Sequence, residues 1–192
     1  DSESRGLGDV YKRQIKKSLD KDTVNYDQMR YEGFGPAGTS IIVEALTDNR
    51  NRTASNVRSS FQKFGGSLGE TGSVSHAFKH YGFLKFNKDV ATEDEFFNFS
   101  IENGAEDCFV EEDEYEAVCL PDTMSRFYDL LAAKYGEPVS SGFQWRPDVL
   151  VKVDGDKLKS LINLINELDS DEDVQQIFSN FEASDEELSR IA

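Results

Sequence analysis

The chain has 192 residues, 38% of them hydrophobic, and is therefore long enough to bury one or two hydrophobic cores. No apolar stretch approaches the roughly 20 residues that a membrane-spanning helix requires. The sequence does not open with the basic and apolar segments of a secretion signal either. These features predict a cytoplasmic protein with no membrane partner, whose two cysteines are reduced.

The net charge of −16 is distributed unevenly along the chain. Residues 1–80 carry a net charge of +2, whereas residues 81–192 carry −18. Because negative charge repels a polyanion, we expect any nucleic acid to bind through the first part. The acidity of the second part is typical of a solvated surface, and a docking face for a basic protein is the alternative.

The first predicted strands cover residues 28–33 and 39–47, the second of them rich in β-branched residues. The glycines between them spell the dinucleotide-loop pattern G-x-G-x-x-G. Such a loop leaves a strand and opens a helix, whereas here it leads into a strand. Pro36 also removes one amide donor. The pattern therefore favours a tight hairpin over a nucleotide site.

A helix is predicted from Arg50 to about Phe64, capped by Asp48 or Asn49 and ended by two glycines. A helix N-terminus presents free amides, and arginines there add bidentate donors for phosphate. The alternative is that these cations pair with acidic residues of the same chain. The candidate phosphate ligands are Arg50, Arg52, Arg58 and Lys63 on the helix and Arg30 on the adjoining strand.

The hairpin before this helix is a second candidate contact. Its tip is hard to explain by packing, so we interpret Tyr31, Phe34, Gly35 and Pro36 as a docking element for a partner. Aromatic residues on strands can also stack on unpaired bases, although they more often belong to a core. The stacking candidates are Tyr31, Phe34, His76, Phe78, His80 and Tyr81.

The middle of the chain has the order β-α-β-β-α-β, which is typical of a ferredoxin-like domain. Thr92 to Glu95 form a capping box at the start of its first helix. A two-residue turn at Asp113-Glu114 would place Cys108 directly opposite Cys119, in apolar contact or, as the alternative, in a redox disulfide. The predicted strands cover 82–87, 107–111, 115–120 and 139–145, and the helices 92–104 and 122–136.

The remaining predicted elements flank this middle segment. Residues 73–78 and 149–153 are strand-like, residues 156–168 form an amphipathic helix, and residues 174–181 form a last strand.

No catalytic arrangement can be assembled from the sequence. His76 and His80, the two histidines of the chain, lie four residues apart and have no third metal ligand nearby in sequence. Neither a Ser-His-Asp set nor a P-loop lysine is present. We therefore expect no enzymatic activity, no metal, no cofactor and no small-molecule substrate. A hydrolase or redox protein is the rival interpretation.

Several separate motifs, in the right order from about Ile15 to the C-terminus, resemble the YebC family. Its mitochondrial members are translational activators of cytochrome c oxidase subunit I. The motifs are Tyr31-Glu-Gly-Phe-Gly-Pro36, Glu44-Ala-Leu-Thr-Asp-Asn-Arg-Asn-Arg-Thr53, Gly65-Gly66, Leu68-Gly69, Gly72-Ser-Val74, Gly104-Ala-Glu-Asp107 and Asp173-Val-Gln175.

The resemblance implies an α+β fold in which a ferredoxin-like domain is inserted into an outer α+β domain. It also implies a basic N-terminal helical domain, of which only Ile15-Lys-Lys17 resembles a part, so we expect polyanion affinity to be weaker than in a full-length relative. The expected boundaries are 1–26 for a tail and remnant helix, 27–80 with 150–183 for the outer domain, 81–149 for the inserted domain and 184–192 for a tail.

The resemblance further implies a non-enzymatic regulator of gene expression. No DNA-reading helix motif is visible, so we favour a translation factor that binds RNA or the ribosome. A DNA-binding transcriptional regulator is the first alternative, and an acidic protein-interaction module is the second.

Overall fold

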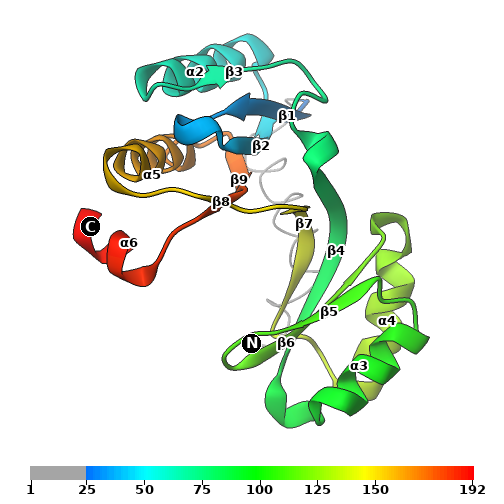
Figure 1. The fold of residues 1–192 in the computed structure, drawn as a ribbon. Helices are drawn as coiled ribbons and strands as arrows, with labels where there is room; N and C mark the ends of the chain where they lie inside the picture. The colour runs from blue at the N-terminus through cyan, green and yellow to red at the C-terminus, as the bar shows by residue number, and fades with distance from the viewer. Residues whose placement is uncertain (1–24) are drawn as a thin grey trace. The chain divides into compact units, whose positions relative to one another are not determined.

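The structure is a computed structural model that describes residues 25–192. Helices and antiparallel sheets alternate along the chain, which confirms the predicted α+β class. The described part divides into two compact units, one of residues 80–144 and one of residues 25–79 together with 145–192 (Figure 1). The predictions for residues 1–24 lie outside the described residues.

The second of these units is built on a four-stranded sheet with the order β3-β1-β2-β9. Strands β1 and β2 form an antiparallel hairpin in which Tyr31 lies opposite Val43. A separate parallel pair joins β8 to β10. The strands are β1 (Asp27–Phe34), β2 (Ser40–Thr47), β3 (Ser67–Leu68), β8 (Val151–Lys152), β9 (Val174–Ser179) and β10 (Phe181–Glu182).

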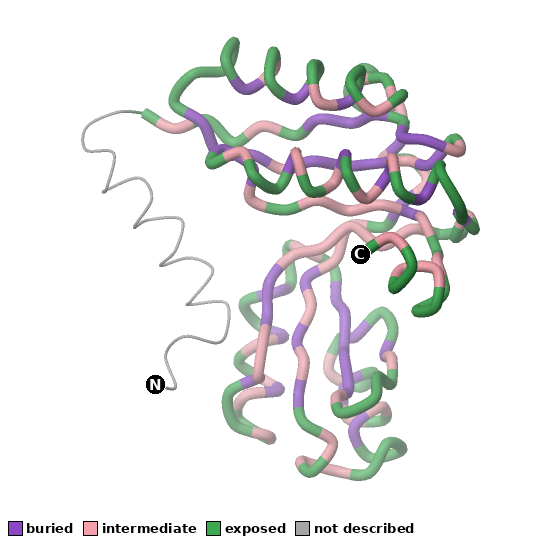
Figure 2. Tube along the Cα trace, turned by 90° about the vertical axis from the view of Figure 1, so that its left-hand side faces the viewer, coloured by how far each residue is buried: buried purple, intermediate pink, exposed green. Residues whose placement is uncertain are grey.

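Two long helices, α2 (Arg50–Lys63) and α5 (Gly155–Asp169), pack together against this sheet. Helix α2 buries Thr53, Val57 and Phe61, which recur every four residues and so lie on one side of the helix. Figure 2 shows this side as repeated purple segments between exposed green turns. The leucines of α5 join the same core, with the side chains of Ile41 and Val43 from β2.

Two segments near the ends of this unit differ from the sequence prediction. The predicted strand 73–78 is a turn followed by the 3-10 helix η3 (Ser75–Ala77), because the loop amides bind a side chain of β1 instead of pairing as a strand. The C-terminal tail contains α6 (Asp185–Ile191), whose first turn is capped by the hydroxyl of Ser184.

The unit of residues 80–144 confirms the predicted β-α-β-β-α-β order, with the strand order β5-β6-β4-β7. The predicted capping box is present, since the Thr92 hydroxyl accepts from the Glu95 amide and the Glu95 carboxylate accepts from the Thr92 amide. The elements are β4 (Phe78–Asn87), η4 (Lys88–Val90), α3 (Glu93–Glu102), β5 (Asp107–Val110), β6 (Glu114–Cys119), η5 (Pro121–Thr123), α4 (Met124–Tyr135) and β7 (Ser140–Pro147).

The predicted contact between the two cysteines is wrong. Val110 pairs with Tyr115 and the Glu111 amide donates to the Glu114 carbonyl, so the two-residue turn lies at 112–113, one residue earlier than predicted, and the register places Cys108 opposite Ala117. Cys119 instead lies opposite Gly82 on β4. Both cysteines are buried and free, and burial raises the pKa of each thiol to about 11.

Candidate nucleic-acid interface

Local hydrogen bonds fix where α2 begins. Asn49 has an extended backbone, and its side-chain oxygen accepts the Arg52 amide at 3.0 Å. The Asn49 amide in turn donates to the hydroxyl of Thr47 at the end of β2. Of the two predicted caps, the structure therefore uses Asn49. This turn brings Arg52 of the first helical turn next to Asp173, in the segment that leads into β9.

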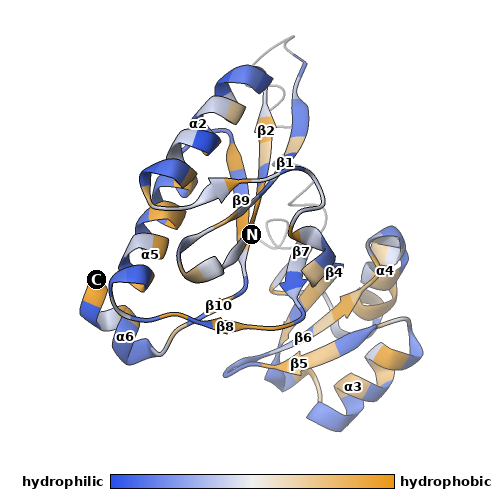
Figure 3. Cartoon of the chain, turned by 45° about the horizontal axis from the view of Figure 1, so that its top comes forward, coloured by the Kyte–Doolittle hydropathy of each residue, from blue (hydrophilic) through white to orange (hydrophobic). Residues whose placement is uncertain are grey.

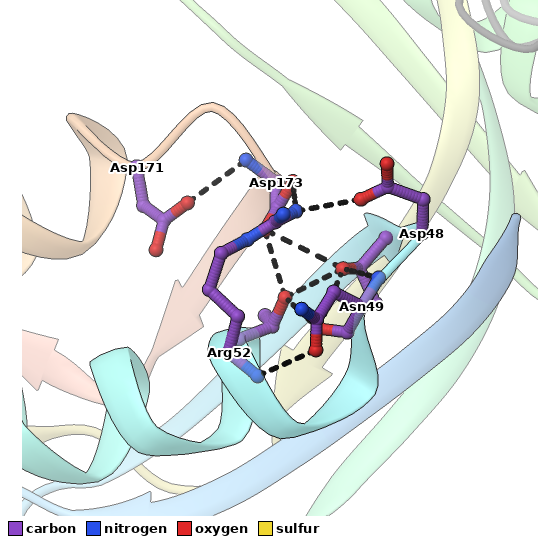
Figure 4. Close-up of polar contacts among 7 residues, drawn as sticks. Asp48, Asn49, Arg52, Asp171 and Asp173 are labelled. Atoms are coloured by element: carbon purple, nitrogen blue, oxygen red, sulfur yellow. Dashed lines mark hydrogen bonds and ion pairs between the residues drawn. The ribbon is translucent and has the colours of Figure 1, made fainter. Parts of the chain in front are cut away.

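Arg52 makes the strongest polar contacts at this helix start (Figure 4). Its Nη2 donates to Asp173 at 2.9 Å and to Asp48 at 2.7 Å, and its Nε donates to Asp173 at 3.3 Å. Hydrogen bonds to Asp173 and then to Asp48 raise the pKa of Arg52 above its ordinary value. Asp173 is only 3% exposed, and the hydroxyl of Thr53 also donates to it at 2.8 Å. A buried carboxylate needs such partners, so Arg52 acts here as a structural counter-ion.

Arg30 lies apart from the other candidate phosphate ligands, which belong to α2. Successive strand residues point to opposite faces of a sheet, and Tyr31 belongs to the core under α2 and α5. Arg30 therefore lies on the opposite face, where its Nε is 3.2 Å from the Glu32 carboxylate and its guanidinium lies over the ring of Trp145 at 5.1 Å. Arg30 therefore does not share a surface with the cations of α2, and its role as a phosphate ligand stays a prediction.

The other three cations of α2 extend into solvent. Arg50 reaches Asp27 only at 4.0 Å, and both side chains are largely exposed. Lys63 contacts Glu167 of α5 at 2.8 Å, also at the surface. Arg58 is exposed and makes no ion pair or hydrogen bond among residues 25–192. Exposed ion pairs of this kind contribute little stability, so their cations remain available to another anion.

The predicted docking hairpin is largely packed. Tyr31, Gly35 and Pro36 are buried, and only Phe34 projects, with 40% exposure. The tip forms the 3-10 helix η2 (Pro36–Gly38), which contacts α5. A Cβ atom on Gly35 would lie 2.7 Å from the Thr39 hydroxyl, so glycine allows the tip to fold back. The interpretation of an exposed tip is corrected to one exposed phenylalanine.

Glu32 is a buried residue whose role the sequence did not reveal. Its carboxylate accepts the amides of Gly72, Val74 and Ser75 at 2.9, 3.1 and 2.6 Å. Burial raises the pKa of this carboxyl, but the three amides together lower it further, to about 2. Glu32 thus holds the glycine-rich loop to β1. One sequence signal could have indicated this role. It is a glutamate inside a buried strand, followed by a loop with many free amides.

The remaining candidates form no second site within the described residues. His76 is exposed beside the Gly72 carbonyl, whereas His80 contacts the ring of Phe143. No cluster of three metal-ligating side chains occurs among residues 25–192. Tyr31 and Phe78 are buried and cannot stack on bases. In the same part of the chain, no helix is both long and apolar enough to cross a membrane.

Comparison with known proteins identifies the family. A family model described as "TACO1/YebC second and third domain" matches residues 26–181. The crystal structure of a conserved hypothetical protein, Aq1575, from Aquifex aeolicus is similar, with 32% sequence identity and a TM-score of 0.76 over 90% of this chain and 72% of that one. The family consists of nucleic-acid-related regulators of gene expression and is not known as an enzyme family. Because the family model covers most of the chain, this protein belongs to the TACO1/YebC family.

Proposed function

We propose that this protein regulates gene expression by binding RNA, free or in the ribosome, through the exposed side and the N-terminal end of α2. The supporting observation is the composition of that helix. It carries Arg50, Arg52, Arg58 and Lys63 and no acidic residue, in a chain whose net charge is −16. Because α2 carries no carboxylate of its own, its surface does not repel phosphates, although the protein as a whole is strongly acidic.

The cations of α2 divide into two roles in this proposal. Arg50, Arg58 and Lys63 contact phosphates, because their side chains reach solvent and have either no partner or a surface partner. Arg52 positions the helix start by its ion pair with Asp173. The exposed part of its guanidinium is a secondary contact for phosphate. Among the four predicted docking residues of the hairpin, Phe34 is the exposed one and can touch a partner directly.

Affinity measured across a salt series tests the proposal. The double variant Arg50→Gln/Arg58→Gln should bind RNA and ribosomes more weakly than the parent protein. The slope of log affinity against log salt should fall by about one for each phosphate that the variant no longer neutralises. The matched control is Lys157→Gln/Lys159→Gln, which removes two exposed cations from the neighbouring helix α5.

The control separates a specific surface from the total charge. Both double variants change the net charge equally, so a purely non-specific effect would weaken both to the same extent. Equal affinities and equal salt slopes for the two double variants would contradict a contact surface on α2.

A further inference from the structure

The exposed side of α2 has an ordered pattern of side chains. An α-helix turns by roughly 100° per residue, so residues four apart lie nearly in line. Along the middle of the exposed side runs a stripe of short or uncharged hydrogen-bonding residues, which we call the central stripe. It consists of Asn51, Ser55, Ser59 and Gln62, all exposed. Figure 3 shows hydrophilic residues along much of this helix.

Cations border the central stripe on both sides. On the same helical projection Arg58 lies along one border and Lys63 along the other. Both are exposed, and the stripe between them extends over about 17 Å of helix. A flat row of hydroxyl and amide groups between two cationic borders is therefore the geometry that the helix offers to a ligand.

From this pattern we infer that the ligand of α2 is double-stranded RNA, contacted across its minor groove. The inference rests on the function proposed above and specifies its partner. The minor groove of A-form RNA is wide and shallow and displays ribose 2′-hydroxyls, and phosphates line both of its edges. The central stripe supplies donors and acceptors for the hydroxyls, while Arg58 and Lys63 face the two phosphate backbones.

Single-stranded RNA fits the same surface poorly. Proteins bind unpaired bases by stacking them on exposed aromatic rings. Among residues 25–192, Phe34 is the only Phe, Tyr or Trp that is exposed, and α2 exposes none. The helix therefore has groups for ribose and phosphate and lacks groups for bases.

Double-stranded DNA fits poorly as well. A helix that reads the DNA major groove reaches base edges with long side chains near its N-terminus. In α2 the guanidinium of Arg52 is held by Asp48 and Asp173, and the middle of the exposed side consists of the short residues Ser55 and Ser59. Serine brings the helix backbone close to a shallow groove but does not extend into a deep one.

The test compares binding of the full chain to three probes of the same sequence, each of about 20 nucleotides or base pairs. They are an RNA duplex, the corresponding DNA duplex and one RNA strand. Fluorescence anisotropy at matched salt measures each dissociation constant. We expect the RNA duplex to bind about tenfold more tightly than either other probe, since only it offers hydroxyls and paired phosphates at a fixed spacing.

The variant Ser55→Ala/Ser59→Ala removes two hydroxyls and no charge, and alanine favours the helix. It should weaken RNA-duplex binding about threefold to tenfold, leave the salt slope unchanged and leave DNA-duplex binding unaffected. The Arg58→Gln variant should instead lower the salt slope on both duplexes. The first variant therefore reports ribose contacts, and the second reports phosphate contacts.

The outcomes distinguish the two proposals. Tight binding that depends on Arg58 but prefers the single RNA strand, or a serine effect that is equal on RNA and DNA, would overturn the duplex-RNA inference and leave the proposed function standing. A preference for the DNA duplex would overturn both. Absence of binding to all three probes and to ribosomes, or binding that is indifferent to the α2 cations, would overturn both.

Discussion

Arg52 and Asp173, which lie 121 residues apart in the sequence, are joined by hydrogen bonds from both Nε and Nη2 of the guanidinium to the carboxylate. Arg52 belongs to the first turn of α2, and Asp173 immediately precedes β9. The pair therefore ties the start of a helix to the edge strand that completes the sheet of its unit. The two sequence motifs that contain these residues meet at this point in the fold.

Neutralising this buried carboxylate should destabilise the protein. Asp173→Asn keeps the size of the side chain but replaces one acceptor oxygen by a donor, so Arg52 and Thr53 cannot both keep charge-assisted bonds. We expect a loss of about 2 kcal/mol in the free energy of unfolding, measured by urea denaturation. The neighbouring exposed residue provides the control, Glu172→Gln, which should change stability by less than about 0.5 kcal/mol. Equal midpoints for the two variants would show that the Arg52–Asp173 pair has no structural role.

Glu32 should make stability depend on pH in the acid range. Its pKa of about 2 in the folded protein lies below the ordinary value of 4.5, so folding favours the charged form. This contribution is present above pH 4.5 and is lost as the pH falls from 4.5 towards 2. Glu32→Gln should therefore cost about 2–3 kcal/mol at pH 6, and the difference from the parent protein should become smaller by pH 3. Urea denaturation of both proteins at the two pH values measures this difference. A cost that is the same at pH 3 and pH 6 would contradict the role of the charge.

Local patterns in the sequence predicted most of the fold. The four-residue spacing of Val57 and Phe61 in α2, the capping box at Thr92 and the glycine that ends α4 each act within one or two turns of chain. Each of these signals acts through residues that are close in sequence, so its structural effect can be predicted without knowing the fold. The same is true of the β-α-β-β-α-β order, which follows from the succession of such local elements.

Features that depend on distant partners could not be predicted in the same way. The sequence shows that Arg52 is a cation, but not that Asp173 comes to lie beside it, because 37 acidic residues were available as partners. It also shows that Arg30 lies on the first strand of the hairpin before the helix, but the face of the sheet on which it lies depends on the strand's orientation in the core. The cysteine register was wrong for a related reason, since a shift of the turn by one residue along the chain changes every pair in a hairpin.

The packing of the hairpin tip predicts a large effect at Gly35 and a small one at Gly38. An added Cβ atom at Gly35 would lie 2.7 Å from the Thr39 hydroxyl and 2.8 Å from a methyl group of Ile41. Gly35→Ala should therefore destabilise the protein by about 1–3 kcal/mol. Gly38 has φ of +70° and open space around it, and asparagine tolerates this conformation, so Gly38→Asn should cost less than about 1 kcal/mol. Thermal unfolding compares the two variants, and a larger loss at Gly38 would contradict the close packing of Gly35 against Thr39 and Ile41.

The two thiols should be unreactive in the folded protein. Burial raises the pKa of Cys108 and Cys119 to about 11, so almost none of either thiol is in the nucleophilic thiolate form at pH 8. Ellman's reagent should therefore react slowly with the native protein and should detect both cysteines at once when urea is added. Since Cys108 lies opposite Ala117 and not opposite Cys119, the same total should be found with and without prior reduction. Rapid reaction of one thiol in the folded state, or a total that rises after reduction, would instead favour the redox interpretation.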